Sequence, residues 1–453
     1  MQVELFDTLS RQKKLLEPQD NTVRIYHCGM TVQSRPHVGH LRGYIVMDAL
    51  RRFLRFKGYE VRLVQNITDI DDKVIDKSRA EGIDWRMLAE RNTGELLRVT
   101  DALNIERPTV MPRATQHIEE IINLVSQIIE KGHAYESAGD VYFDVRSYPA
   151  YGKLSGKRID ELESGARIES SENKRDPLDF ALWKAAKPAE PYWFSPWGKG
   201  RPGWHIECSA MSTHYLGPCF DLHAGGEDLV FPHHENEIAQ YEAATGKGFA
   251  KAWMHVEMLN LRGEKMSKST GHLVVASDVI DAYDPNVLRM FTLRVHYRAQ
   301  TEYTMEGMDE ARSAWERITT FLTAAESLAP EPALASEYPE LDAALSDDFN
   351  TPKAVGLVFD LVREGNDALS AGDKDKLADI TARLNLALEI LGFAPRRDRG
   401  GEDIQTLLDL LVGFRTELRM AKEFGWSDKL RDMIQAAGLI MEDTKEGTRI
   451  RFR

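Results

Sequence analysis

Two histidines near the start of the chain have a spacing that suits contact with phosphate. His37 and His40 belong to the run Pro36-His-Val-Gly-His40, which lies where a helix is predicted to begin. A helix N-terminus presents free N–H groups and a partial positive charge to an anion. Gly39 lacks the side chain that would keep a nucleotide from approaching. The run therefore predicts a phosphate site, although two histidines in a loop are by themselves an ordinary finding.

A second run, Lys265-Met-Ser-Lys-Ser269, lies more than two hundred residues further along the chain. Catalysis of phosphoryl or nucleotidyl transfer consists mostly of positioning and charge stabilisation, so lysines on a loop suit it. Lys265 and Lys268 could neutralise a leaving pyrophosphate. A lysine-rich loop is more often simply solvated, and it is the co-occurrence of the two runs that favours a site for a triphosphate such as ATP.

The elements that must position these residues alternate as in an α/β fold. A short apolar strand over residues 23–26 precedes Cys28, and a second strand is predicted over residues 59–64. Between them lies a helix whose apolar residues recur every three or four positions: Leu41, Tyr44, Met47, Leu50 and Leu54. Strand, loop, helix and strand begin a doubly wound parallel sheet, and ligands bind at the carboxyl edge of such sheets.

The composition bounds the class of protein. The 453 residues suffice for roughly two to four domains, and 42% hydrophobic with 29% charged residues is typical of a globular protein. The net charge of −14 argues against coating nucleic acid through bulk electrostatics, although it leaves room for a local basic face. The three cysteines cannot all pair, and we find neither a signal-peptide pattern nor an apolar run that could span a bilayer. We therefore expect a cytoplasmic protein without a membrane partner.

The two charged runs match the signature motifs of class I aminoacyl-tRNA synthetases, the first as a valine variant of His-Ile-Gly-His. Four further runs narrow the resemblance to the cysteinyl-tRNA synthetase family: Asn66-Ile-Thr-Asp-Ile-Asp-Asp-Lys73, Gly203-Trp-His-Ile-Glu-Cys-Ser-Ala-Met211, Phe231-Pro-His-His-Glu-Asn-Glu237 and Asp347-Asp-Phe-Asn-Thr-Pro352. These runs are spread over most of the chain, and together they are highly specific.

The resemblance implies a reaction in two steps. ATP, with Mg²⁺, and L-cysteine give cysteinyl-adenylate and pyrophosphate, and the adenylate then esterifies the 3′-terminal adenosine of tRNA(Cys). His37 and His40 would act at the α-phosphate, and Lys265 and Lys268 on the pyrophosphate; these four residues and Gly39 would bind ATP. The working expectation for the oligomeric state is a monomer.

The resemblance also implies a domain organisation. We expect an α/β fold with a Rossmann-type parallel-sheet catalytic domain, an inserted connective module, an α-helical bundle and a small C-terminal anticodon-binding domain. The expected boundaries are residues 1–110 with 196–250 for the catalytic domain, 111–195 for the inserted acceptor-end module, 251–307 for a stem-contact region carrying the lysine run, 308–394 for the bundle and 402–453 for the anticodon-binding unit. The charged stretch 164–175 reads as a mobile loop in the inserted module, and 449–453 as a basic tail.

Selection of cysteine over serine requires more than a shaped pocket, because a pocket rejects a near-isostere only about a hundredfold. A zinc ion binds thiolate tightly, at about 2.3 Å. The resemblance implies one zinc ion per chain, joined by the substrate sulfur and held by four residues of suitable type: Cys28, Cys208, His233 and Glu237. His234 is a rival ligand that spacing alone does not exclude. Buried free thiols are the usual alternative for the two cysteines.

Other residues are candidates for substrate contact. Cys28, Thr68 and Trp204 are assigned to the amino-acid site. Thr68 and Asp69 follow a strand and could hold the amino group or ribose, and capping is an equally good role. Trp204 could close the pocket, although a core tryptophan is nearly as common.

Two acidic residues and one cysteine are expected to be structural. Asp71 and Asp72 are predicted to cap the following helix, whose dipole favours acid there. Cys219 has no partner at a ligand spacing, so we expect it in the core.

Some positions depart from the family pattern. Met30 replaces the usual proline and Gln33 the usual tyrosine, which bears on the shape of the pocket. Ile450 stands where an aromatic residue is usual after Gly447-Thr448, so the way in which anticodon bases are read is open.

Two rival functions remain from the sequence. One is a ligase that activates cysteine in the same way but joins it to an amino sugar, from which the Asp347–Pro352 run and the regions after it distinguish this chain. The other is a tRNA-binding protein without catalysis, against which the four intact signature residues argue.

Overall fold

The computed structural model describes residues 2–158, 173–261, 264–265, 274–328, 335–395, 399–436, 439–444 and 447–452. The chain divides into two compact units, Met1–Ala394 and Pro395–Arg453. Most of the predicted mobile loop 164–175 and most of the lysine run 265–269 lie outside the described residues.

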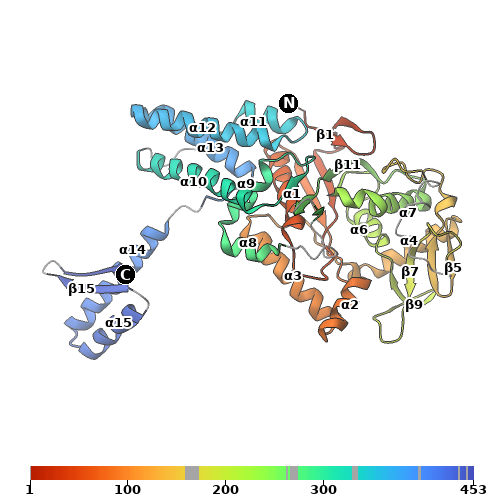
Figure 1. Ribbon diagram of the computed structural model, residues 1–453, viewed down its shortest axis with the longest axis horizontal. Coiled ribbons are helices and arrows are strands. Elements are labelled where there is room, and N and C mark those ends of the chain that lie inside the picture. The colour runs from red at the N-terminus through yellow and green to blue at the C-terminus, as the bar shows by residue number, and fades with distance from the viewer. Residues whose placement is uncertain are drawn as a thin grey trace. The chain divides into compact units, whose positions relative to one another are not determined.

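A four-stranded sheet forms the centre of the larger unit (Figure 1). Its strands are β3 (Thr22–His27), β4 (Glu60–Gln65), β10 (Phe220–Gly226) and β11 (Ala250–Val256), in the order β11-β10-β3-β4. All neighbours are parallel, with Ile25 opposite both Leu63 and Leu222. The sheet confirms the predicted doubly wound parallel fold.

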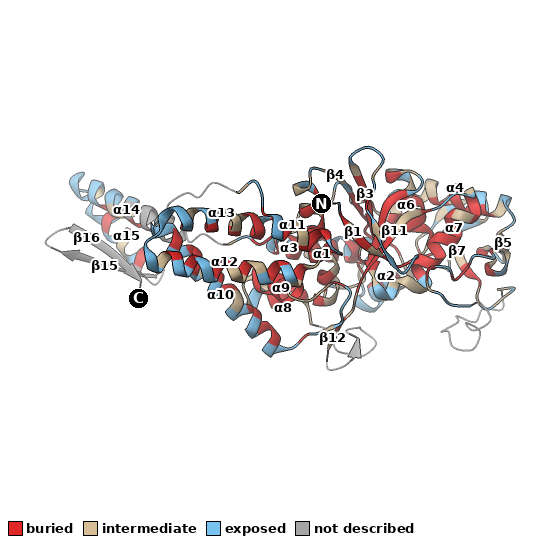
Figure 2. Cartoon of the chain, turned by 90° about the horizontal axis from the view of Figure 1, so that it is seen from above, coloured by how far each residue is buried: buried red, intermediate tan, exposed pale blue. Residues whose placement is uncertain are grey.

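Successive residues of β3 face opposite sides of this sheet, and each side is covered by helices. Ile25 belongs to a core shared with α1 (Val38–Phe56), the helix predicted from its apolar spacing. Tyr26 faces a second core shared with α6 (Ile206–Leu216) and α7 (Glu235–Thr245). Buried residues are concentrated in these strands and on the inward sides of the helices (Figure 2). The carboxyl edge of the sheet is therefore lined by the starts of α1, α6 and α7.

Residues between β4 and β10 build the remaining parts around this edge. After α2 (Asp72–Glu81) and α3 (Trp85–Ala102), a 3-10 turn at Ala114–Gln116 leads into α4 (Ile118–Glu130). A five-stranded antiparallel sheet follows, in the order β5-β6-β7-β9-β8. Its strands are β5 (Ala134–Ser137), β6 (Asp140–Phe143), β7 (Phe180–Ala185), β8 (Trp193–Ser195) and β9 (Gly198–Pro202).

The predicted cap at the start of α2 is confirmed for Asp71 and wrong for Asp72, which is the first residue of the helix. The carboxylate of Asp71 accepts a hydrogen bond from the backbone N–H of Lys73 at 2.8 Å. The next residue, Asp72, points to the antiparallel sheet, where its carboxylate pairs with Lys184 of β7 and Arg201 of β9. These ion pairs join the inserted sheet to the start of α2.

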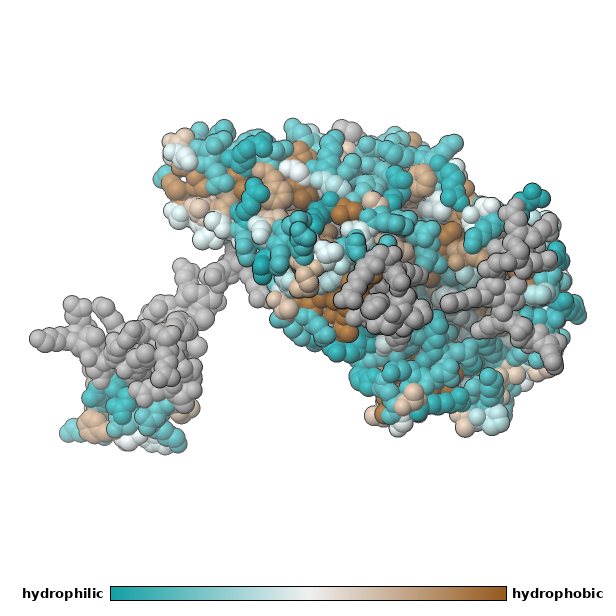
Figure 3. Space-filling model, in the orientation of Figure 1, coloured by the Kyte–Doolittle hydropathy of each residue, from teal (hydrophilic) through white to brown (hydrophobic). Residues whose placement is uncertain are grey.

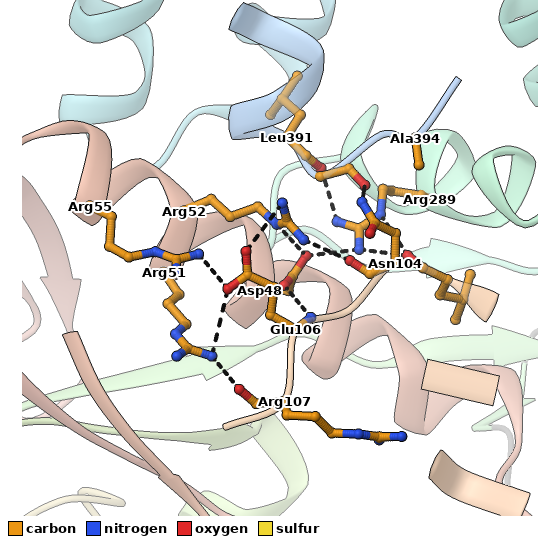
Figure 4. Close-up of polar contacts among 12 residues, drawn as sticks. Asp48, Arg51, Arg52, Arg55, Asn104, Glu106, Arg107, Arg289, Leu391 and Ala394 are labelled. Atoms are coloured by element: carbon orange, nitrogen blue, oxygen red, sulfur yellow. Dashed lines mark hydrogen bonds and ion pairs between the residues drawn. The ribbon is translucent and has the colours of Figure 1, made fainter. Parts of the chain in front are cut away.

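Helices dominate the rest of the larger unit. They are α8 (Ala276–Ala282), α9 (Pro285–Leu293), α10 (Met305–Leu328), α11 (Pro339–Ser346), α12 (Thr351–Ala371) and α13 (Lys374–Ile390). Short strands accompany them: β1 (Glu4–Asp7) pairs with β2 (Gln12–Leu15), and β12 (Leu259–Leu261) pairs with β13 (Glu264–Lys265) and β14 (Thr301–Glu302). A buried ion pair between Asp48 of α1 and Arg289 of α9 ties the first helix to this group (Figure 4).

The smaller unit contains α14 (Arg399–Met420), α15 (Phe424–Ala436) and a hairpin of β15 (Leu439–Thr444) and β16 (Gly447–Phe452). The prediction of a basic tail differs from this result, because residues 449–452 lie in a strand. The alternation of basic and apolar residues in Arg449-Ile-Arg-Phe has the period of two that strands favour.

The prediction that Cys219 packs in the core is wrong, since its side chain is exposed. Cys219 lies in the turn between α6 and β10 with a φ of 52°. A left-handed residue in a tight surface turn directs its side chain away from the packed elements.

The face of the molecule in Figure 3 is largely hydrophilic. Within the described ranges, we find no helix with the length and apolar character to cross a bilayer.

Candidate active site and metal centre

Four predicted ligands meet at the carboxyl edge of the parallel sheet. Cys28 follows β3 directly, Cys208 lies in the first turn of α6, and His233 and Glu237 lie at the junction of the π-helical turn Val230–His234 with α7. Their ligand atoms all lie within 4.8 Å of one another, and all four side chains are buried. The arrangement is compatible with a metal site.

The distances within this cluster are short in every direction. The Sγ atoms of Cys28 and Cys208 are 4.0 Å apart, and the Cys28 Sγ lies 3.5 Å from Glu237 Oε1. The same carboxylate oxygen lies 3.0 Å from His233 Nε2, one helical turn away. Four donors therefore converge on one point from three separate elements.

The electrostatics of the cluster suit a cation. Burial raises the pKa of the Cys28 thiol, whereas the hydrogen bond that Cys28 donates lowers the pKa of Cys208 to about 6. Burial raises the pKa of Glu237, but the imidazoles of His223 and His233 lower it to about 2. Burial lowers the pKa of His233, but Glu237 and Cys208 raise it to about 10. A metal ion would take the place of the protons that these groups now share.

His234, the rival ligand, belongs to a second grouping with Cys28, His223 and Glu237. Its Nε2 lies 3.3 Å from Cys28 Sγ, while its Nδ1 bonds Nε2 of His255 at 2.7 Å. Burial and the neighbouring imidazoles hold the pKa of His234 well below its usual range, so the ring is neutral. Both histidines are thus close enough to the cluster to act as the imidazole ligand of a metal ion. Of the two, only His233 also lies beside Cys208, with which it shares a hydrogen bond.

The predicted substrate residues lie next to this cluster. The indole of Trp204 stacks on His233 with 4.5 Å between ring centroids, and Lys73 of α2 lies 5.3 Å from the centre of the indole. Thr68 is buried just after β4, where its hydroxyl accepts a hydrogen bond from Asn66 at 3.1 Å. Asp69, the alternative contact, is already bonded to the backbone and hydroxyl of Thr115. The residue that departs from the family pattern, Met30, is buried behind this strand end.

Sequence reasoning missed several buried polar groups around the cluster. His27, His223 and His255 are buried on three adjacent strands, His27 and His255 near the carboxyl ends of β3 and β11 and His223 in the middle of β10. Glu207, next to Cys208, is 1% exposed, and burial raises its pKa well above the usual range. A histidine or acid inside an otherwise apolar buried strand or helix start was the available signal, because such groups are seldom buried without a partner.

The two histidines of the first motif stand where they were predicted. His37 is the N-cap of α1, and its backbone N–H donates to His40 Nδ1 at 3.4 Å. The two rings stack with 3.5 Å between their centroids. Gly39 is half-buried in the first turn of α1. The two imidazoles share one helix start, the kind of position at which anions bind, although the backbone N–H of Val38 there already donates to the carbonyl of Val274.

The structure also brings the chain beyond the lysine run to this helix start. Residue His37 forms an isolated antiparallel bridge with Val275, and backbone bonds of 3.0 and 2.9 Å join Val38 to Val274 and Ala276 to Pro36. The backbone of Lys265 pairs with β12. Lys268 lies outside the described residues. Residues 274–276, which follow the second signature motif in the chain, are therefore hydrogen-bonded to the first motif.

Two family models match the chain. The model for the tRNA synthetases class I (C) catalytic domain matches residues 15–313. The DALR domain model matches residues 340–394, which hold α12, α13 and all of α11 except its first residue. Solved synthetases share the fold. A Mycobacterium tuberculosis methionyl-tRNA synthetase in complex with methionyl-adenylate aligns with a TM-score of 0.56 at 18% identity, over 82% of this chain and 89% of that one. An Agrobacterium radiobacter K84 LeuRS-tRNA-LeuAMS complex aligns with a TM-score of 0.59 at 12% identity, over 84% and 85%. The chain is a class I aminoacyl-tRNA synthetase in fold and in its catalytic-domain model.

Curated relatives specify the family within this class. The cysteine–tRNA ligase of Desulforudis audaxviator is 44% identical over 474 residues, with 99% of both chains covered. The cysteine–tRNA ligase of Anoxybacillus flavithermus is 44% identical over 470 residues, with 100% of both chains covered. The chain belongs to the cysteine–tRNA ligase family.

Proposed function

We propose that this chain activates L-cysteine with ATP, transfers it to tRNA(Cys), and selects the amino acid with a zinc ion. The observation that carries the proposal is the convergence of Cys28, Cys208, His233 and Glu237 beside the start of the parallel sheet's first helix. An acyl-adenylate formed at that helix start would have its side chain next to the four ligands.

The donor set supports zinc. Two thiolates, an imidazole and a carboxylate are the ligand types that zinc prefers, with Zn–S bonds of about 2.3 Å. A tetrahedron with such bonds separates two sulfur atoms by about 3.8 Å, and the two Sγ atoms here lie 4.0 Å apart. When bound, zinc supplies a Lewis acid that favours a substrate thiolate over a hydroxyl, and thus cysteine over serine. His233 is the proposed imidazole ligand, since it lies beside both Cys208 and Glu237.

This chain's own residues would carry the activation step. His37 and His40 at the start of α1 would hold the α-phosphate of ATP during in-line attack by the cysteine carboxylate. Lys265 and Lys268 would balance the charge on the departing pyrophosphate, together with Mg²⁺. Gly39 lets the nucleotide approach the helix start. Trp204, stacked on His233, would cover the bound side chain, and Thr68 would line the opposite wall.

The remaining regions would bind tRNA. We assign residues 111–195 to the acceptor end, 251–307 to the stem and 402–453 to the anticodon, in a chain that acts as a monomer. A chain ending at Ala394 keeps the whole larger unit. It is expected to retain cysteine-dependent ATP–pyrophosphate exchange and to lose tRNA charging, whereas equal charging by both forms would remove the anticodon role.

The deciding experiment is transfer of labelled cysteine to purified tRNA, with serine run in parallel. Cysteine-specific charging is the expected result. Adenylate and pyrophosphate without charged tRNA would favour the ligase that joins cysteine to an amino sugar. Absence of any exchange in metal-replete protein would favour a tRNA-binding protein without catalysis.

A further inference from the structure

One buried acid beside the metal cluster has an oxygen without a partner. Glu207 occupies the second position of α6, directly before Cys208, and is 1% exposed. Its Oε2 makes no hydrogen bond to any described residue. Buried carboxyl oxygens are almost always hydrogen-bonded, because leaving one unpaired costs its full desolvation energy. Such an oxygen indicates a ligand that is absent from the structure.

The rest of the Glu207 side chain is held by a chain of hydrogen bonds. The Gly29 N–H donates to Asn66 Oδ1 at 2.8 Å, and Asn66 Nδ2 donates to Thr68 Oγ1 at 3.1 Å. The Thr68 hydroxyl is hydrogen-bonded to the Glu207 carboxyl. The chain begins one residue after the ligand Cys28 and ends one residue before the ligand Cys208. The carboxyl group is therefore fixed relative to both sulfur ligands while Oε2 stays unused.

The neighbouring charged groups do not satisfy this oxygen. Asp69 and Asp71 add negative charge, and their carboxylates are occupied by Thr115 and by the first turn of α2. Lys73 contacts the ring of Trp204 instead. Among the described residues, no cation pairs with Glu207. The site has an excess of acid that a small cationic ligand would balance.

We propose that Glu207 binds the α-ammonium group of the amino-acid substrate through Oε2. The inference rests on the proposed function and deepens it. In cysteine the nitrogen is three bonds from the sulfur, and in the protein Glu207 directly precedes Cys208 and is linked through Thr68 and Asn66 to the residue that follows Cys28. The substrate is then recognised at two points, its thiol by the metal cluster and its ammonium by Glu207.

The test separates these two points with substrate fragments. Cysteamine carries the thiol and the amine, whereas 3-mercaptopropionate carries the thiol without an amine. Both are measured as competitive inhibitors of cysteine-dependent ATP–pyrophosphate exchange in the full chain and in Glu207→Gln. Loss of one hydrogen bond to a charged group raises the inhibition constant of cysteamine about 10- to 100-fold. The inhibition constant of 3-mercaptopropionate is expected to differ by less than about twofold between Glu207→Gln and the wild type. The KM for ATP and the metal content should likewise be unchanged within about twofold.

Two further variants keep the inference falsifiable. Asp179→Asn is the matched control, a buried acid of the inserted region whose oxygens are bonded to Tyr135 and Val145; it is expected to leave the ratio of the two inhibition constants unchanged. If Glu207→Gln does not fold or loses metal, Glu207→Asp is judged by the same ratio, which should rise. The proposal would be overturned by an equal effect of Glu207→Gln on both inhibitors or by no effect on either. A cysteamine-selective loss in Asp179→Asn would also overturn it. Failure of the wild type to charge tRNA would count against the proposed function. The ratio of the two inhibition constants would still be interpretable, because ATP–pyrophosphate exchange is measured without tRNA.

Discussion

The sulfur atoms of Cys28 and Cys208 lie 4.0 Å apart although 180 residues separate them in the chain. Cys28 follows the central strand β3, and Cys208 lies in the first turn of α6, which packs against that strand. The hydrogen bond between them leaves Cys208 as the thiolate, because its pKa is lowered to about 6. The fold thus holds a ready anionic sulfur against a second thiol, as a soft cation requires.

Substitution of Cys208 by serine should remove metal and amino-acid discrimination together. The hydroxyl is a poor zinc ligand, so three donors remain where four are needed. We expect metal content, measured by atomic emission, to fall from about one per chain to a small fraction. The ratio of exchange rates with cysteine and serine should fall by at least about tenfold, toward the limit of a plain pocket.

Cys219→Ser is the control for that change, because Cys219 is exposed and outside the cluster. It should keep both metal and discrimination. A metal-replete Cys208→Ser variant with an unchanged preference for cysteine would contradict the zinc assignment.

Replacement of His40 by alanine should reduce the rate of activation more than substrate binding. His40 lies in the first turn of α1, against the ring of His37, where a developing charge on the α-phosphate would be stabilised. Removing one such donor typically costs a factor of about 10² to 10³ in kcat. ATP–pyrophosphate exchange measures the loss, with KM for cysteine expected to stay within about threefold. His214→Ala, a substitution at a surface position on α6, should leave kcat unchanged; a comparable loss there would show that the His40 effect is not local.

Local patterns in the sequence were sufficient to predict the first half of this site. The apolar spacing of α1 and the glycine-containing turn before it place His37, His40 and Cys28 at one sheet edge, as the structure shows. The π-helical turn before α7 keeps His233 and Glu237 within one turn, as their spacing of four predicts. These are short-range features, governed by helix and strand periods.

The features that could not be predicted depend on packing between distant segments. Glu207 has the same local sequence pattern as an ordinary acid in the first turn of a helix. Its burial, its contact with Thr68 and its one oxygen without a hydrogen bond depend on packing between distant segments. Cys219 resembles a core cysteine until the turn geometry after α6 is known. The order of strands in the antiparallel sheet, with β9 between β7 and β8, likewise follows from tertiary contacts that no local pattern records.

Acid should selectively weaken the contact between α3 and the turn before α1. The hydrogen bond from Arg98, with further bonds from Ser277 and Arg35, lowers the pKa of Glu95 from 4.5 to about 2. A depressed folded-state pKa contributes stability above the unfolded value near 4.5, and that stability is lost as the pH falls toward 2. Glu95→Gln is expected to cost about 1 kcal/mol at pH 7, since the side chains of Arg35 and Arg98 are about half exposed to solvent.

Urea unfolding at several pH values checks this prediction. The difference between wild type and Glu95→Gln should shrink steadily below pH 4.5 and vanish near pH 2. Glu316→Gln, at an exposed pair 4.0 Å from Arg312, is the control and should show no difference at any pH. A gap for Glu95→Gln that persists at low pH would mean that packing, and not charge, is responsible.

The buried pair of Asp48 and Arg289 should be the most sensitive stabilising contact of the larger unit (Figure 4). The guanidinium of Arg289 donates to Asp48 Oδ2 at 2.8 Å, to the carbonyl of Leu103 at 2.8 Å and to that of Leu391 at 2.9 Å. It therefore joins α1, the end of α3 and the end of α13. Arg289→Met removes all of these donors and leaves Asp48 with less compensation in the interior, at a cost of about 3–5 kcal/mol.

The measurement is the midpoint of urea unfolding of the larger unit, with Arg363→Met as the control. Arg363 pairs with Asp360 on the surface of α12, where both side chains are at least half exposed, so its loss should change stability by less than about 0.5 kcal/mol. Arg289→Met should also lower the temperature at which the protein loses ATP–pyrophosphate exchange activity, because Asp48 lies in α1, the helix capped by His37. The kcat at 25 °C should be nearly unchanged. Equal midpoints for the two variants would mean that Arg52, which lies 3.1 Å from Asp48, compensates the carboxylate without help.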